Sequence, residues 1–444
     1  MGSSSSKTAY SANNTRGASV AAYELSSALT DTLNEINLNG HLQNWLGSLN
    51  EQLRQLLERL DQEAAKYTNS KVNDDESREW DPSQAEVQLI SVAWKCARGT
   101  YDLEGTVTDT GYCTFRRDQV VDSSFAGTVK LITSTIIEAK TGSRIIESLP
   151  VLVLAIRGSA SKMDHIVNAN AQPRTTESFI GCLEDLKAHS GFLNSARALD
   201  SIVTNLVNKY LESFPEMSEK KPHVLFTGHS AGGAVSQLLY LRHMSNQNLN
   251  QSARFSCVTF GAPPCLTQHV DLDIFQPSSG TVCVNVINEF DVVTRADKPY
   301  ILSLVDVARA MLDLPPKATI SELETSEGIV SAALEATRDE KRPLSDDSED
   351  FPVKESNFWR FPQPFYHHVG PRVILLMRFV DNQMSLKAVE VSTSEFQKLL
   401  FCRVTVHGKK LYEERISALE QGRFNNLSAW KPDGDYKDKL LDQK

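Results

Sequence analysis

A serine between two glycines is the strongest chemical signal in this sequence. Gly228, Ser230 and Gly232 form a GxSxG pattern, with an apolar, strand-like run before it at 224–227 and a helix-like run after it at 234–241. A tight turn between a strand and a helix can hold a serine on a strained elbow with its Oγ exposed. Glycines suit such a turn because the two backbones pass close to each other. The pattern predicts that Ser230 is a nucleophile; the alternative is an ordinary tight turn with an unreactive serine.

A nucleophilic serine needs a base, and it needs an acid that orients the base. A carboxylate follows the apolar, strand-like run 282–288, and residues that follow parallel strands meet at the carboxyl edge of a sheet. Asp291 fits this place better than Glu289, because the segment 292–295 continues as a loop leaving the sheet would. We therefore expect Asp291 to orient the base, with a solvated carboxylate at the end of a strand as the alternative.

Five segments in a fixed order resemble the class 3 lipase family of α/β-hydrolases, in its branch of fungal and diacylglycerol lipases. They are residues 151–159, 189–193, 228–233, 258–263 and 288–291. The resemblance extends over about residues 84 to 415. It implies an α/β fold with a central, mostly parallel sheet flanked by helices, and an enzyme that hydrolyses the acyl esters of lipids.

Two backbone N–H groups are expected to form the oxyanion hole. The resemblance assigns one of them to Ser159, and the start of the helix after the elbow supplies the other from Ala231. Each donor aimed at the tetrahedral oxyanion contributes on the order of 3 kcal/mol. The segment 161–169 stands where fungal relatives have a lid, although it also fits an ordinary surface helix. His229, inside the elbow, is expected to support the turn rather than to react.

Two histidines compete for the role of the base. His368 matches the position of the catalytic histidine in small fungal class 3 lipases. His407 comes after three more segments, at 372–379, 385–391 and 393–401, and this longer layout resembles diacylglycerol lipases and plant phospholipases A1. We favour His407, keep His368 as the alternative base, and allow that neither of them reacts.

Composition and charge exclude several other classes of function. The chain has 444 residues and a formal net charge of −10, so no broad basic surface indicates a nucleic-acid partner. No apolar run has the length of a membrane span, and the seven cysteines resemble buried thiols of an intracellular protein. No CxxC or HExxH pattern indicates a metal site. We expect a cytoplasmic enzyme that needs neither a cofactor nor a metal.

Charge and hydrophobic patterns divide the chain into five parts. Leucines spaced by three and four residues between 42 and 60 suit a helical hairpin or a coiled-coil contact in a homodimer. The predicted parts are a flexible start (1–17), a helical hairpin (18–68), a linker (69–83), the hydrolase domain with an insertion at 305–360 (84–419), and a polar tail (420–444).

The first residues match the pattern for N-terminal myristoylation. Gly2 follows Met1, and a hydroxyl residue stands at Ser6. One myristoyl chain gives only marginal, reversible membrane binding. An unmodified, flexible start is the alternative. Acylation of Gly2 would place the protein peripherally on a membrane or lipid-droplet surface.

The sequence as a whole predicts a serine hydrolase that cleaves acyl esters of lipids, with glycerolipids as the expected substrates. Ser230 would form the acyl-enzyme, with His407 as the base and Asp291 as the orienting acid. The alternative is a catalytically weak, lipase-like protein that serves signalling or interaction. A lipid-binding module is a third possibility, which would need the acyl groove but not the triad.

Overall fold

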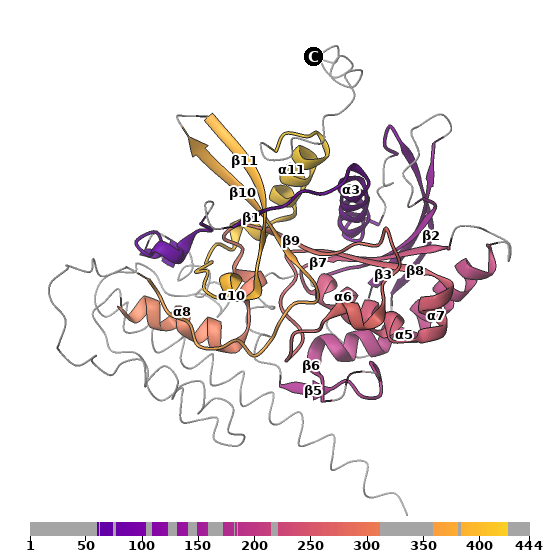
Figure 1. Cartoon of the computed structure of the whole chain (residues 1–444), viewed down its shortest axis with the longest axis horizontal. Coiled ribbons are helices and arrows are strands. Elements are labelled where there is room, and N and C mark those ends of the chain that lie inside the picture. The colour runs from indigo at the N-terminus through magenta and orange to yellow at the C-terminus, as the bar shows by residue number, and fades with distance from the viewer. Residues whose placement is uncertain are drawn as a thin grey trace, which may run out of the picture.

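The computed structural model describes most of the central part of the chain. The described residues are 60–61, 63–73, 77–103, 109–122, 131–140, 149–158, 172–181, 183, 185–214, 221–310, 358–380 and 383–424. One large twisted sheet crosses this part, with helices on both of its faces (Figure 1).

The sheet has nine strands in the described residues, and its centre is parallel. Their order from one edge to the other is β1 (Arg78–Glu79), β11 (Gln383–Val391), β10 (Arg372–Val380), β9 (Cys283–Asn288), β8 (Arg254–Phe260), β7 (His223–His229), β4 (Val151–Ile156), β3 (Leu131–Ala139) and β2 (Cys113–Asp122). Strands β4, β7, β8, β9 and β10 run parallel, and the strands outside them pair antiparallel. A separate two-stranded sheet consists of β5 (Pro173–Thr175) and β6 (Lys187–His189).

The sheet is covered on both faces. One face carries α5 (Ser190–Glu212), α6 (Ala231–Met244) and α7 (Gln247–Ser252), and the other carries α3 (Gln84–Gly99) and α11 (Lys409–Glu420), as Figure 1 shows. The remaining helices are short or lie at the edge: η1 (Thr68–Ser70), η2 (Leu272–Phe275), η3 (Val292–Arg295), α8 (Lys298–Ala310), α10 (Thr393–Phe396) and η5 (Thr405–His407). This arrangement confirms the predicted α/β fold with a central sheet flanked by helices.

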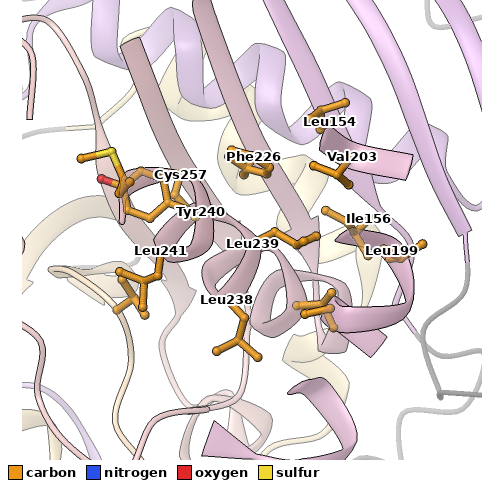
Figure 2. Close-up of a cluster of buried hydrophobic side chains, with 14 of the residues drawn as sticks. Leu154, Ile156, Leu199, Val203, Phe226, Leu238, Leu239, Tyr240, Leu241 and Cys257 are labelled. Carbon is orange, nitrogen blue, oxygen red and sulfur yellow. The ribbon is translucent and has the colours of Figure 1, made fainter. Parts of the chain in front are cut away.

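Alternating side chains of the central strands fill two separate cores. Leu154, Ile156 and Phe226 point to the face of α5 and α6, where they pack with Leu199 and Leu239 (Figure 2). Their neighbours along the strands point to the opposite face, where Val153, Ala155 and Leu225 pack with Trp94 of α3 and Ile416 of α11. The strands are apolar on both faces because helices exclude water from both. This packing fixes the ends of β7 and β9 on either side of β8.

The predicted linker 69–83 contributes to the packed body of the protein. Its β1 pairs with β11, and its buried Asn69 donates hydrogen bonds to the carbonyl oxygens of Trp359 and Lys398, at 2.8 and 2.6 Å. Asn69 and β1 thus make packing contacts that a free linker would not make.

The described ends of the predicted insertion 305–360 also pack. Val305 and Ala308 of α8 are buried together with Leu60, and Trp359 lies against the same cluster. The rest of the insertion, residues 1–59 with the predicted hairpin and dimer contact, and the tail from 425 lie outside the described residues.

Candidate active site

The turn between β7 and α6 holds Ser230 in a disfavoured backbone conformation. Ser230 has φ of 61° and ψ of −135°, which non-glycine residues rarely adopt. Its N–H donates to the carbonyl oxygen of Phe260 on β8, at 2.9 Å. Strain of this kind persists only where neighbouring structure maintains it, and it is common at reactive residues. The turn thus has the geometry that the GxSxG pattern predicted.

The glycines of the elbow are required by close backbone contacts. A Cβ on Gly232 would lie 2.1 Å from the carbonyl oxygen of Ile156, and a Cβ on Gly228 would lie 2.4 Å from the carbonyl carbon of Gly232. Neither neighbour can move away easily because both are backbone atoms. The same reason applies to Gly158 at the end of β4, where a Cβ would lie 2.6 Å from the carbonyl oxygen of His229.

Three of the predicted site residues form one hydrogen-bonded series. The Nε2 atom of His407 lies 2.8 Å from Ser230 Oγ, and its Nδ1 atom lies 2.9 Å from Oδ2 of Asp291. The three residues come from the β7–α6 turn, the end of η5 and the loop after β9, and all are buried. An ionised carboxylate accepts hydrogen bonds but donates none, so Nδ1 of His407 carries the proton that it shares with Asp291. Nε2 of His407 is then free to accept the hydrogen bond of the Ser230 hydroxyl.

Asp291 is held by several further donors. Its Oδ1 accepts the N–H of Val293 at 3.0 Å, and its Oδ2 accepts the hydroxyl of Tyr412 at 2.8 Å. The Tyr412 hydroxyl in turn accepts the N–H of Asn288, at 3.1 Å. Burial and the nearby Asp291 charge raise the pKa of Tyr412 well above its usual value, so its hydroxyl stays a donor. These bonds fix the carboxylate that faces His407.

Gly261 makes room for this cluster. Its φ is +56°, and a Cβ there would lie 2.8 Å from the Tyr412 hydroxyl, 2.9 Å from Asp291 Oδ2 and 3.0 Å from His407 Nδ1. In the sequence, Gly261 stands out only as part of a segment that resembles the class 3 lipases, and Tyr412 carries no signal of a role. Nothing in the spacing of Tyr412 indicated that its hydroxyl reaches Asp291.

His229 supports the loop that carries His407. Its Nε2 donates to the carbonyl oxygen of His407 at 3.1 Å, so its Nδ1 can accept the hydroxyl of Tyr101, at 3.2 Å. The two imidazole rings stack with their centroids 4.6 Å apart. His229 thus contacts the loop of His407 through both its ring nitrogen and its ring face.

His368 has different surroundings. Its Nε2 donates to the carbonyl oxygen of Ala262 at 3.0 Å, and its ring meets the edge of Phe396. Burial and the neighbouring Arg372 lower the pKa of His368 to about 3, so the ring stays neutral near pH 7. The structure does not bring His368 into the hydrogen-bonded series with Ser230.

Glu289, the carboxylate set aside in favour of Asp291, serves a different contact. Its buried side chain accepts the N–H of Val72 at 2.9 Å and pairs with Arg378, whose Nη2 lies 2.7 Å from Oε1. Glu289 thus ties the segment before β1 to β10.

The oxyanion hole is only partly described. Ala231 is buried at the first position of α6, where backbone N–H groups lack intrahelical acceptors. Gly158, just before the predicted donor Ser159, lies close to the nucleophile, since its Cβ would be 3.3 Å from that of Ser230. Ser159 itself, the segment 161–169 and Gly2 lie outside the described residues. The two N–H donors therefore remain predictions.

Neither a metal cluster nor a membrane-spanning helix occurs in the described part of the chain. No three His, Cys, Asp or Glu side chains there are grouped so that they could hold a metal ion. None of the helices in those residues combines the length and the apolar character needed to cross a bilayer.

Comparison with known families identifies the segment that holds the elbow and Asp291. Residues 153–300 match the lipase (class 3) family. The matched residues make up a third of the chain, and over them the chain is similar to the class 3 lipases. The match confirms the resemblance seen in the sequence and the predicted class of enzyme, a lipase-type carboxylic ester hydrolase. No curated protein matches the chain.

Several solved lipase structures are similar to this chain at low identity. A Rhizomucor miehei lipase propeptide complex is 15% identical, covering 73% of this chain and 80% of its own, with a TM-score of 0.42. Lipase II from Rhizopus niveus is 16% identical, covering 48% and 75%, with a TM-score of 0.36. Lip2 lipase from Yarrowia lipolytica is 16% identical, covering 49% and 77%, with a TM-score of 0.37.

Proposed function

We propose that this protein hydrolyses the acyl esters of glycerolipids through an acyl-enzyme formed on Ser230. The proposal rests on one observation, the unbroken series of hydrogen bonds from Ser230 Oγ through the His407 ring to the Asp291 carboxylate, at 2.8 and 2.9 Å. A serine hydroxyl is a weak nucleophile unless an oriented base takes its proton during attack. This series supplies both the base and the group that orients it.

The reaction then proceeds in two halves. Ser230 Oγ attacks the ester carbonyl while His407 Nε2 takes the hydroxyl proton, and Asp291 stabilises the imidazolium that forms. The N–H groups of Ala231 and Ser159 hold the oxyanion. His407 returns the proton to the leaving alcohol, and the acyl group stays on Ser230. Water, deprotonated by the same nitrogen, releases the fatty acid and restores the serine.

The substrate class follows from the chemistry of the family. Lipases act on carboxylic esters with long acyl chains, and the proposal assigns such esters, as glycerolipids, to this protein. A peripheral position on a membrane or lipid droplet would bring such substrates to the site. Acylation of Gly2 would supply part of the binding, on the order of 10⁴ M⁻¹ for a single chain.

Fatty-acid release from a panel of lipids tests the proposal. Purified full-length protein is incubated with emulsified trioleoyl-, dioleoyl- and monooleoylglycerol, with dioleoyl phosphatidylcholine vesicles, and with a soluble short-chain ester. We expect release from at least one glycerolipid and none from Ser230→Ala, which lacks the nucleophile. If the wild type hydrolysed only the soluble ester, the glycerolipid assignment would be wrong. If it hydrolysed none of them, the alternative of a lipase-like interaction protein would be favoured.

A further inference from the structure

A small, partly open pocket lies beside the segment that follows Asp291. Its walls include Arg295 at the end of η3, Arg372 at the start of β10, the neighbouring His367 and His368, and Gln397 just after α10. None of these side chains belongs to the proposed triad. We refer to this cavity as the Arg372 pocket.

Arg372 presents hydrogen-bond donors that no described residue uses. Its side chain is 5% exposed, and its Nε and Nη2 donate to the carbonyl oxygen of Val391 at 3.3 Å and to Thr393 Oγ1 at 2.8 Å. A guanidinium carries more N–H groups than these two bonds occupy. Burial lowers the pKa of Arg372 to about 10, and the Glu390 carboxylate offsets part of this shift without forming an ion pair with Arg372 among the described residues.

Arg295 adds a second buried charge to the same wall. It is 6% exposed, and it donates to the carbonyl oxygens of Phe396, Gln397 and Leu399. Its guanidinium carbon lies 4.4 Å from the centroid of the Tyr300 ring. The hydrogen-bond partners of Arg295 are thus uncharged, and no described carboxylate forms an ion pair with it. The positive charge is therefore not neutralised by a partner in direct contact.

Asp297 is the acid of the pocket, and its oxygens are already occupied. Oδ1 accepts the N–H of Tyr300 at 3.0 Å, and Oδ2 accepts the N–H of Phe365 at 2.8 Å. Burial raises the pKa of Asp297 to about 6. Among the residues that line the pocket, one carboxylate thus stands against two guanidinium groups, while Glu390 acts on Arg372 from outside this lining.

We propose that the Arg372 pocket binds a small oxyanion, such as inorganic phosphate or a short carboxylate. Buried charges are normally paired, and the planar guanidinium group matches the oxygens of these anions. The enclosed part of the pocket has room for only a few non-hydrogen atoms, which limits the ligand to a small ion. Arg372 at the start of β10 supplies the free donors, and Arg295 at the end of η3 adds its positive charge.

The anion would act on the proposed catalytic acid through η3. This short helix begins directly after Asp291, and Thr294, which also lines the pocket, donates its hydroxyl to the Asp291 carbonyl oxygen at 2.7 Å. A ligand on Arg295 would hold the far end of η3. We therefore expect bound anion to stabilise the folded protein and to restrict the loop that carries Asp291.

Thermal unfolding of the full-length protein tests the proposal. Inorganic phosphate, acetate and chloride are titrated at constant ionic strength, so that the first two arms separate phosphate from carboxylate ligands. We expect phosphate or acetate, compared with chloride, to raise the Tm of the wild type by a few degrees at saturation. Equal Tm values in all three salts would overturn the proposal.

Gln397→Glu is the decisive variant, because it puts a carboxylate into the pocket without changing side-chain length. It should raise the Tm in chloride and abolish the response to the anion. Gln119→Glu, on the exposed side of β2, makes the same chemical change elsewhere and should leave the response intact. Arg372→Gln should lose the response. If Arg372→Gln did not fold, Gln397→Glu would still decide, and an unchanged anion response in Gln397→Glu would refute the proposed site.

Discussion

Two buried histidines of this protein differ in what their rings contact. His407 lies between a serine hydroxyl and a carboxylate, with 2.9 Å between its Nδ1 and Asp291 Oδ2. His368 donates to a backbone carbonyl oxygen and has Arg372 as its charged neighbour. Both rings are shielded from water to a similar degree. Burial alone therefore does not distinguish a candidate base from a histidine of the core; the sign of the neighbouring charge does.

The difference matters because a base becomes positively charged during the reaction. An imidazolium at position 407 would face the carboxylate of Asp291, which stabilises it. An imidazolium at position 368 would be buried beside a guanidinium, and its pKa of about 3 reflects that cost. His368 thus lacks the means to accept a proton at neutral pH, although its sequence context matches the fungal lipases.

The largest expected effect separates the two histidines directly. His407→Ala should lower kcat for a soluble short-chain ester by about 10⁴- to 10⁶-fold, because the serine loses its base. His368→Gln, which keeps an N–H for the Ala262 carbonyl oxygen, should stay within about tenfold of the wild type. Steady-state kinetics on folded variants measures both. A large loss in His368→Gln with activity retained in His407→Ala would reverse the assignment.

Substitutions of the two carboxylates near the end of β9, Asp291 and Glu289, should also differ in their effect on kcat, and the larger of these effects should be smaller than that of His407→Ala. Asp291→Asn should lower kcat by about 10⁴-fold, since an amide favours the wrong imidazole tautomer. Glu289→Gln should lower the Tm instead and change kcat little, because Glu289 pairs with Arg378 and not with a histidine. Parallel kinetics and thermal unfolding distinguish the outcomes, and a costly kcat defect in Glu289→Gln alone would contradict the account.

Tyr412 should show an intermediate effect as a positioning residue. Tyr412→Phe removes the hydroxyl that donates to Asp291, which we expect to lower kcat by about tenfold with KM nearly unchanged. Tyr210→Phe is the matched control. The Tyr210 hydroxyl donates to the carbonyl oxygen of Pro150, just before β4, whereas Ser230 lies near the other end of that strand. Equal kinetics for the two variants would show that the Tyr412 hydroxyl does not position the acid.

The smallest effect concerns stability at acid pH. The folded-state pKa of His368 is lowered to about 3, so the unfolded chain binds its proton first and stability falls as pH drops below about 6.5. Between pH 7 and 5.5 the wild type should lose about 1 kcal/mol more unfolding free energy than His368→Gln. Asp297, with its raised pKa, shifts stability in the opposite direction over part of this range in both proteins. Urea titrations at both pH values would detect the difference, and parallel losses would refute it.

The sequence predicted the parts of the site that depend on local signals. The elbow follows from glycine spacing between an apolar run and a helix-periodic run. The position of Asp291 follows from the end of β9, the second strand after the elbow. Both signals are contained within about twenty residues. The family resemblance added the order of the segments and the fold, which the family match and the sheet topology bear out.

Features that depend on distant packing could not be read in this way. The sequence left two histidines in competition, and the structure brings His407, not His368, into contact with both Ser230 and Asp291. The contact of Tyr412 with Asp291 likewise joins residues far apart in the chain. The segment 69–83 looked like a linker because it is polar. Composition does not reveal that Asn69 donates to the distant carbonyl oxygens of Trp359 and Lys398. The Arg372 pocket, too, joins η3, β10 and α10.

Active-site labelling with a fluorophosphonate ester tests the central claim most directly, namely that His407 activates Ser230. The probe reacts covalently with an activated serine, and mass spectrometry locates the label. We predict stoichiometric labelling of Ser230 in the wild type and in His368→Gln at similar rates, no labelling of Ser230→Ala, and labelling of His407→Ala slowed by several orders of magnitude. Labelling of His407→Ala at the wild-type rate, or undiminished labelling of Ser230→Ala, would contradict the account.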